Sequence, residues 1–152
     1  MQDEQNKLEN FLKETNIEYD RNYVRMEKGP KPFLYKALTF SYQLRFTILD
    51  FYYLVFTEDA ILLLTQDEDY AFTTNNQMIL NHQDIRCFSF QKIYGAYCIS
   101  FTYQNEKYYF YLNDAYSTKI LHKVFRTDNI DYSRNHLLYL EKRNFMGLLN
   151  DR

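Results

Sequence analysis

Residues 97–112 read YCISFTYQNEKYYFYL, and this stretch decides the fold. In its first half, large apolar side chains alternate with the small side chains of Cys, Ser and Thr, a period of two that is typical of a strand with one buried face. The polar residues 104–106 then provide a turn into a second strand over 107–112. We therefore expect two antiparallel strands joined in a hairpin.

The chain before this hairpin holds more segments that look like strands. In residues 38–48, apolar side chains occupy the even positions and polar side chains the odd positions, which again predicts a strand with one buried face. Two β-prone runs, 51–56 and 61–65, are separated by a short polar break at 57–60 and should pair antiparallel. Shorter strand-like segments lie at 23–26, 70–73, 78–80 and 85–93. Together these segments predict a β meander over residues 34–112.

Helical patterns flank the meander on both sides. Residues 1–16 carry Leu8, Phe11 and Leu12 on one narrow apolar stripe, which predicts an amphipathic N-terminal helix. After the last strand, residues 114–126 can form a helix that Asn113 or Asp114 would cap. A further C-terminal helix is expected over 134–149.

This order of elements resembles the bacterial pleckstrin-homology-like (PH-like) domains. Residues 54–64 are similar to that family's hairpin, in which a strand ending in Thr turns through polar residues into a hydrophobic strand. Residues 78–92 and 97–112 are similar to the segments that follow it. The chain departs from the family pattern at Ala60, where an Arg is usual, and in having a second helix after the strands.

The resemblance implies an α+β fold that is mainly β. The expected core is an antiparallel barrel or sandwich of about seven strands, with an N-terminal helix and one or two C-terminal helices. The helix at 114–126 would cap the open end of the barrel. Residues 1–152 would then form a single domain, which is an ordinary size for one hydrophobic core.

Composition restricts the possible partners and the location. With a net charge of −2, the chain has no global basic field for nucleic acid. It opens with polar residues rather than an apolar signal segment, and its most apolar run, 51–65, is interrupted by Glu58 and Asp59. We therefore expect a cytoplasmic protein without a transmembrane segment.

The sequence contains no motif of a catalytic, cofactor or metal site. We find no nucleophile elbow, no Gly-rich phosphate loop and no HExxH motif, and Cys87 and Cys98 lack the spacing of zinc ligands. The expectation is a protein that is not an enzyme and has no cofactor. A pocket that gathered His82 or His136 with a carboxylate would reverse this expectation.

A basic segment precedes the first long strand. Its five cations can line a loop that meets an anionic lipid headgroup, or they can form a solvated loop that balances the acidic residues at 58–69. These candidate anion-contact residues are Arg21, Arg25, Lys28, Lys31 and Lys36.

Aromatic residues are in excess on the late strands and the last helix. Because neighbouring side chains in a strand point to opposite faces, both faces of the 107–112 strand carry apolar side chains. Either the terminal helices cover the second face, or it is an exposed patch that recognises a protein. The candidate protein-contact residues are Tyr108, Tyr109, Tyr111, Tyr139 and Phe145.

The leading hypothesis is a non-enzymatic cytoplasmic binding or adaptor domain whose partner is another protein or a second copy of itself. One alternative is peripheral binding to anionic membranes through residues 21–36. Another is a small immunity or inhibitor protein of a bacterium or phage, since low Gly with abundant Asn, Lys, Tyr and Phe is typical of AT-rich genomes.

Overall fold

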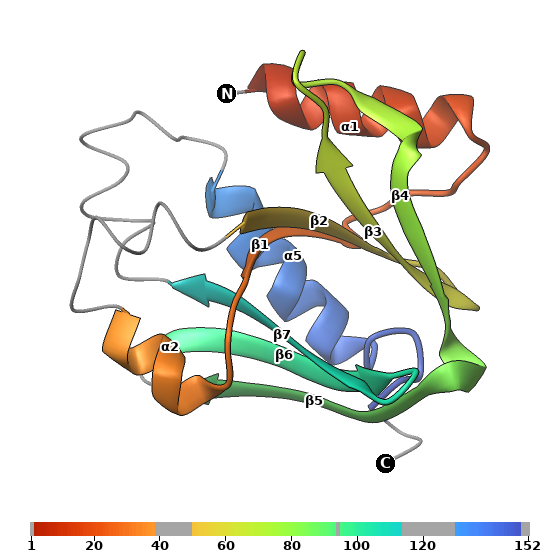
Figure 1. Ribbon diagram of the computed structural model, residues 1–152. Helices are drawn as coiled ribbons and strands as arrows, with labels where there is room; N and C mark the ends of the chain where they lie inside the picture. The colour runs from red at the N-terminus through yellow and green to blue at the C-terminus, as the bar shows by residue number, and fades with distance from the viewer. Residues whose placement is uncertain (1, 39–49, 94, 114–129, 150–152) are drawn as a thin grey trace.

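A computed structural model describes residues 2–38, 50–93, 95–113 and 130–149 (Figure 1). These residues form a mainly β structure with an N-terminal and a C-terminal helix. The strands are β1 (Tyr23–Lys28), β2 (Asp50–Phe56), β3 (Ala60–Gln66), β4 (Phe72–Asn81), β5 (Ile85–Ile93), β6 (Ala96–Tyr103) and β7 (Glu106–Asn113). The helices of the described residues are α1 (Gln2–Glu14), α2 (Pro32–Leu38), the short 3-10 helix η1 (His82–Asp84) and α5 (Ile130–Lys142).

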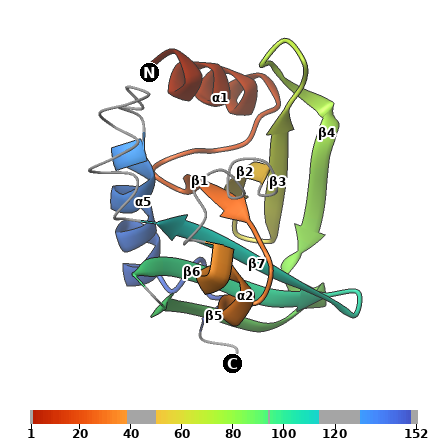
Figure 2. The same cartoon turned by 60° about the vertical axis from the view of Figure 1, so that its left-hand side comes forward.

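All seven strands belong to one antiparallel sheet with the order β4-β3-β2-β1-β7-β6-β5. β1 therefore joins two meanders, one of β2 to β4 and one of β5 to β7. The expected fold was an antiparallel barrel or sandwich of about seven strands; the seven antiparallel strands are confirmed, but the sheet does not close into a barrel, because β4 and β5 are its two edges and do not pair with each other. Figures 1 and 2 show the physical reason: the chain turns at η1, and the two strands leave that corner at a wide angle.

The hairpins predicted from the sequence are confirmed. β6 and β7 pair across their whole length, so that Phe101 lies opposite Tyr108. β2 pairs antiparallel with β3 around the polar break. In that turn the Thr57 amide donates to the Ala60 carbonyl at 2.9 Å, and the Thr57 hydroxyl accepts from the Ala60 amide at 3.0 Å.

The start of the predicted meander is corrected. Residues 32–38 form the short helix α2, although a strand was expected from residue 38 and the meander from residue 34. Pro32 suits the first position of a helix, where its missing N–H is not needed, and the Tyr35 amide donates to the Lys31 carbonyl at 3.0 Å. The remainder of the predicted strand, 39–49, and the predicted capping helix, 114–126, lie outside the described residues.

The last helix also differs in its bounds from the predicted 134–149. α5 ends at Lys142, and the next residues turn sharply because Asn144, Phe145 and Met146 all have positive φ values of 48° to 57°. Gly147 follows with φ 96°. This turn folds Phe145 and Leu148 back into the core, whereas a continued helix would carry them past it.

Hydrophobic side chains pack on both faces of the sheet. The largest cluster lies between the two halves of the bent sheet and is closed by α5 through Leu137 and Leu140. On the outer face of β2 and β3, the predicted stripe of α1 is buried against the sheet, which confirms it. A third, smaller cluster lies where α2 covers β6 and β7 (Figure 2).

Candidate functional site

Most of the predicted protein-contact aromatics are part of the core. Tyr108 lies in a row of stacked rings with Phe101 and Phe110, with the Phe101 and Tyr108 centroids 5.3 Å apart. Phe145 is fully buried, and its ring centroid lies 5.0 Å from that of Phe90 and 5.2 Å from that of Phe56. These rings stabilise the fold and leave no surface for a partner.

The second face of β7 is covered by α2, an element that the sequence did not reveal. The rings of Tyr35 and Tyr111 stack at 3.7 Å and within 2° of parallel. The Tyr111 hydroxyl donates to the Pro30 carbonyl at 2.6 Å, and burial raises the pKa of this hydroxyl. Tyr109 is half-buried beside the same cluster. The covering helix is therefore α2, while the sequence pointed to the terminal helices.

The five candidate anion-contact residues do not form one patch. Arg25 and Lys28 lie three positions apart in β1, so they point to opposite faces of the sheet. The Arg25 guanidinium lies 3.9 Å from the Phe51 ring and 3.7 Å from a Glu4 carboxylate oxygen. The Lys28 ammonium lies 4.9 Å from the Tyr108 ring. Both cations already have contacts within the protein.

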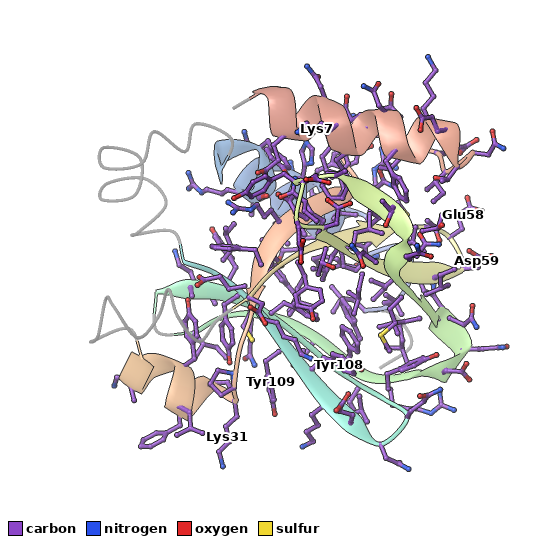
Figure 3. The ribbon with its side chains drawn as sticks, turned by 45° about the horizontal axis from the view of Figure 1, so that its top comes forward. Lys7, Lys31, Glu58, Asp59, Tyr108 and Tyr109 are labelled. Carbon is purple, nitrogen blue, oxygen red and sulfur yellow. The ribbon has the colours of Figure 1, made fainter. Side chains whose placement is uncertain are left out.

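The other three cations lie in two separate places. Lys31 is exposed just before α2 and near Tyr109 (Figure 3), and Lys36 is exposed within α2, away from the loop that follows α1. Arg21 belongs to that loop and pairs with its neighbour Asp20. The structure thus separates the set that the sequence placed together.

An open groove of about 1100 Å³ lies at the end of the molecule that carries Arg21 and Tyr139. Its walls come from the loop after α1, the β2–β3 turn, the end of β4, and the C-terminal part of α5 with the turn that follows. Apolar side chains form part of its floor, among them Leu62 and its cross-strand partner Ile79. Ile79 is 51% exposed, which is unusual for an isoleucine in a strand.

Asn22 holds the loop after α1 in place. It is buried, and its side-chain amide donates to the Phe56 carbonyl at 2.9 Å and to the Glu18 carbonyl at 3.1 Å. Its side-chain oxygen accepts from the Asp20 amide at 2.8 Å. One buried side chain therefore fixes one wall of the groove to β2.

A compact charged cluster surrounds Tyr139 at one end of the groove. The guanidinium groups of Arg21 and Arg143 lie 3.9 Å and 4.4 Å from the centre of its ring. The Arg21 Nε donates to an Asp20 carboxylate oxygen at 3.1 Å, and this bond holds the pKa of that carboxyl below its usual value. The structure brings together one predicted cation, Arg21, and one predicted aromatic, Tyr139.

The opposite rim of the groove is acidic. Glu58 and Asp59 lie side by side in the β2–β3 turn at the outer edge of the molecule (Figure 3), and Glu18 is exposed in the loop after α1. Within the described part of the chain, neither Glu18 nor Glu58 forms an ion pair. The Asp59 carboxylate accepts from the Thr57 hydroxyl at 3.0 Å.

His136 belongs to a buried polar cluster that fastens α1 and α5 to β1. Its Nδ1 donates to the Tyr23 carbonyl at 2.7 Å, and the Tyr23 hydroxyl donates to Glu9 and accepts from Gln5. Burial lowers the pKa of His136, which favours the neutral form of the ring. His136 is buried and does not line the groove. In residues 2–38, 50–93, 95–113 and 130–149, no His, Cys, Asp and Glu side chains gather as a metal site would require.

Sequence reasoning missed most of the groove. Its lining consists largely of ordinary polar residues in a loop and a turn, which have no distinctive spacing. The one sequence feature that coincides with the groove is the polar break at 57–60. It predicts a hairpin turn, and nothing in it indicates a binding surface. The apolar Ile79 was assigned to a strand, and nothing in the sequence shows that half of it is exposed.

No protein-family model matches the chain, and no curated protein matches it. Across the described ranges, none of the helices is long and apolar enough to cross a membrane. The functional assignment therefore depends on the geometry and chemistry of the groove.

Proposed function

We propose that this protein is a non-enzymatic cytoplasmic binding domain that recognises a segment of a partner protein in the groove. The observation that carries the proposal is the combination of an exposed apolar floor, around Ile79, with a charged rim. Exposed apolar surface bounded by polar residues is typical of protein-binding sites. Tyr139 adds an aromatic ring flanked by two arginines, and Tyr and Arg are enriched among residues that dominate binding energy.

The chemistry of the groove favours binding over catalysis. A carboxyl that acts as a general acid near neutral pH needs a raised pKa. In the groove the pKa of Asp20 is lowered instead, because Arg21 stabilises its charged form. Glu58 is exposed to solvent in the β2–β3 turn. These carboxylates serve as charged contacts for a ligand.

We further propose that the domain is PH-like. Its support is the resemblance of residues 54–64, 78–92 and 97–112 to that family, together with two antiparallel meanders joined through β1 and β7. A C-terminal helix packed on β1 is in keeping with the proposal. The fold class does not set the function. The residues of the groove are what support the proposed function.

The proposal is tested by selecting a random dodecapeptide display library on the immobilised protein. Ile79→Ser removes an exposed apolar side chain from the groove floor. Met78→Ser is its matched control, because Met78 is 41% exposed, adjacent in sequence, and on the opposite face of β4. We expect enriched peptides to bind the wild type and Met78→Ser about equally. The Ile79→Ser variant should bind the same peptides about tenfold more weakly, since loss of a buried aliphatic contact costs about 1.5 kcal/mol.

Two results would reject the proposal. One is the absence of enrichment over repeated rounds. The other is enrichment of peptides whose binding is the same for Ile79→Ser and Met78→Ser, which would place the binding surface elsewhere. Circular dichroism and urea unfolding of both variants check that the fold is retained.

A second candidate function, peripheral membrane binding, is favoured by one observation on α2. Phe33 is 70% exposed and Leu34 is 46% exposed, and both lie between Lys31 and Lys36. Apolar side chains flanked by lysines can insert at an anionic membrane surface. The contact surface would then be α2, since Arg25 and Lys28 have contacts within the protein.

Flotation with phosphatidylserine-containing vesicles tests this second candidate. Binding that disappears in the Phe33→Ser/Leu34→Ser variant and persists in Tyr70→Ser would support it, because Tyr70 is equally exposed but lies in a loop away from α2. Absence of salt-sensitive flotation by the wild type would reject it.

A further inference from the structure

We infer that the groove selects a positively charged, extended peptide segment that carries at least one apolar side chain. This inference rests on the proposed function and names the class of ligand. It depends on the sign of the charge around the groove, on the shape of its floor, and on which of its charges are already satisfied within the protein.

Carboxylates outnumber cations along the groove. Four acidic side chains line it, against two basic ones. The acidic residues are Glu18, Asp20, Glu58 and Asp59, and the basic residues are Lys13 and Arg143. The groove as a whole therefore attracts a cationic ligand and repels an anionic one.

The charges are also unevenly distributed along the groove. At the Tyr139 end, Asp20 is paired with Arg21, and Arg143 over the Tyr139 ring leaves this end with one positive charge in excess. Glu58, at the opposite rim, and Glu18, in the loop after α1, have no ion-pair partner among the described residues. Asp59 lies beside Glu58 in the turn. A ligand that places Lys or Arg at this rim would supply the missing countercharge.

The floor of the groove determines the other half of the ligand's chemistry. Ile79 and Leu62 lie opposite each other on β4 and β3, and Ile17 and Met146 also line the groove. An apolar side chain from the ligand can cover Ile79. Lysine and arginine also fit, because their aliphatic stems can cover apolar surface while the charged ends reach the carboxylates.

The size of the groove favours a peptide over a small molecule. Pockets for small ligands are typically about 300–1,000 Å³ and enclose most of the ligand surface. This groove has about 1100 Å³ and is open to solvent along its length. An extended segment of a few residues can lie along it from Tyr139 to Glu58.

Three synthetic peptides that differ only in charge test the inference. Each fluorescein-labelled nonapeptide carries Leu at alternating positions, with Lys, Gln or Glu at the positions between. Fluorescence anisotropy measures their binding to the intact protein at low and at 0.5 M salt. We expect the Lys peptide to bind about tenfold more tightly than the Gln peptide at low salt, with the difference shrinking at about 0.5 M salt. The Glu peptide should bind most weakly.

A charge-matched pair of variants locates the effect. Glu18→Lys/Glu58→Lys reverses two carboxylates of the groove. Glu68→Lys/Asp69→Lys reverses two exposed carboxylates of the β3–β4 loop and changes the net charge of the protein by the same amount. The Lys peptide should lose about tenfold in affinity for the first variant and little for the second, since exposed pairs act over about 10 Å or less.

The outcomes separate this inference from the proposed function. Equal binding of the Lys and Gln peptides, with both weakened by Ile79→Ser, would overturn the charge selectivity and leave protein recognition standing. Equal losses in the two charge-reversed variants would also overturn it, because a general field would then explain the binding. If no peptide binds and the library selection yields nothing, both ideas fail. A dimer in light scattering that Ile79→Ser dissociates would overturn it in favour of a second copy as the occupant.

Discussion

Two aromatic regions of this molecule differ in what surrounds their rings. Around Phe145, the neighbours are other rings, including Phe56, Phe88 and Phe90, and each of these contacts lies within the core. Around Tyr139, the neighbours are the guanidinium groups of Arg21 and Arg143, and the ring is half-buried at the wall of a groove. The two residues are only six positions apart in the sequence, at the end of α5 and in the turn that follows it.

The difference shows that aromatic residues close together in the sequence can serve either the core or the surface, depending on what surrounds their rings. A ring that packs against rings on all sides contributes apolar burial and fixed geometry to stability. A ring that packs against exposed cations retains a face or edge for a ligand.

Removing the ring of Phe145 should cause the largest loss of stability. Phe145→Ala leaves a cavity between three aromatic rings and should lower the free energy of unfolding by about 3–5 kcal/mol. Tyr139→Ala removes a half-buried ring and exposed cation–π contacts, which should cost about 1 kcal/mol or less. Urea unfolding of both variants measures the contrast. Equal losses would mean that Tyr139 is as much a core residue as Phe145.

The Asn22 side chain connects stability with the shape of the groove. Asn22→Ala leaves the Phe56 and Glu18 carbonyls without their donor and should cost about 2 kcal/mol. Amide chemical shifts of residues 16–20 should change with it, because the loop loses its anchor. Asn75→Ala is the control, since Asn75 is exposed in β4. A loss no larger than the control's would show that the loop is held by other contacts.

His136 should make stability depend on pH. Its pKa in the folded protein lies below the ordinary value of 6.5 because of burial, so the unfolded chain binds the proton more tightly. The stabilisation is present above about pH 6.5 and is lost as the pH falls through the folded pKa, by at most about 1.4 kcal/mol per pH unit.

Urea unfolding at pH 7 and pH 5 tests this dependence on His136. The free energy of unfolding should fall less between these two values in His136→Gln, whose amide can still donate to the Tyr23 carbonyl. An identical fall in the wild type and the variant would assign the pH dependence to other groups.

The smallest effect on stability is expected for the charge-reversed groove variant. Glu18→Lys/Glu58→Lys changes two exposed residues without ion-pair partners among the described residues, so its free energy of unfolding should lie within about 0.5 kcal/mol of the wild type. Thermal unfolding measures this. A clearly larger loss would show that these carboxylates stabilise the loop and the turn.

The sequence predicted the regular part of the fold well. The alternation of large and small side chains in 97–103, with the polar residues 104–106, correctly predicted the β6–β7 hairpin. The apolar stripe of Leu8, Phe11 and Leu12 correctly predicted the buried face of α1. Those patterns have a period, and the period follows from backbone geometry. The open sheet was not predicted, because strand patterns do not show whether two edge strands will meet.

The candidate site was predicted only in fragments. Arg21 and Tyr139 were each selected, but for different reasons and as parts of different surfaces. Their contact joins positions more than a hundred residues apart, which no local pattern encodes. Phe145 was selected for its aromatic character, and the positive φ values that turn it into the core cannot be inferred from Asn144 or Met146 alone.

The most direct test of the central claim is an NMR titration of the ¹⁵N-labelled protein with a peptide from the library selection. If the groove is the recognition site, amide shifts should change in the loop at 16–22, the turn at 57–60, and at Ile79, Tyr139 and Arg143, while α2 and β5 stay unchanged. Changes confined to α2 or to the β5 edge, with the groove unaffected, would contradict the account.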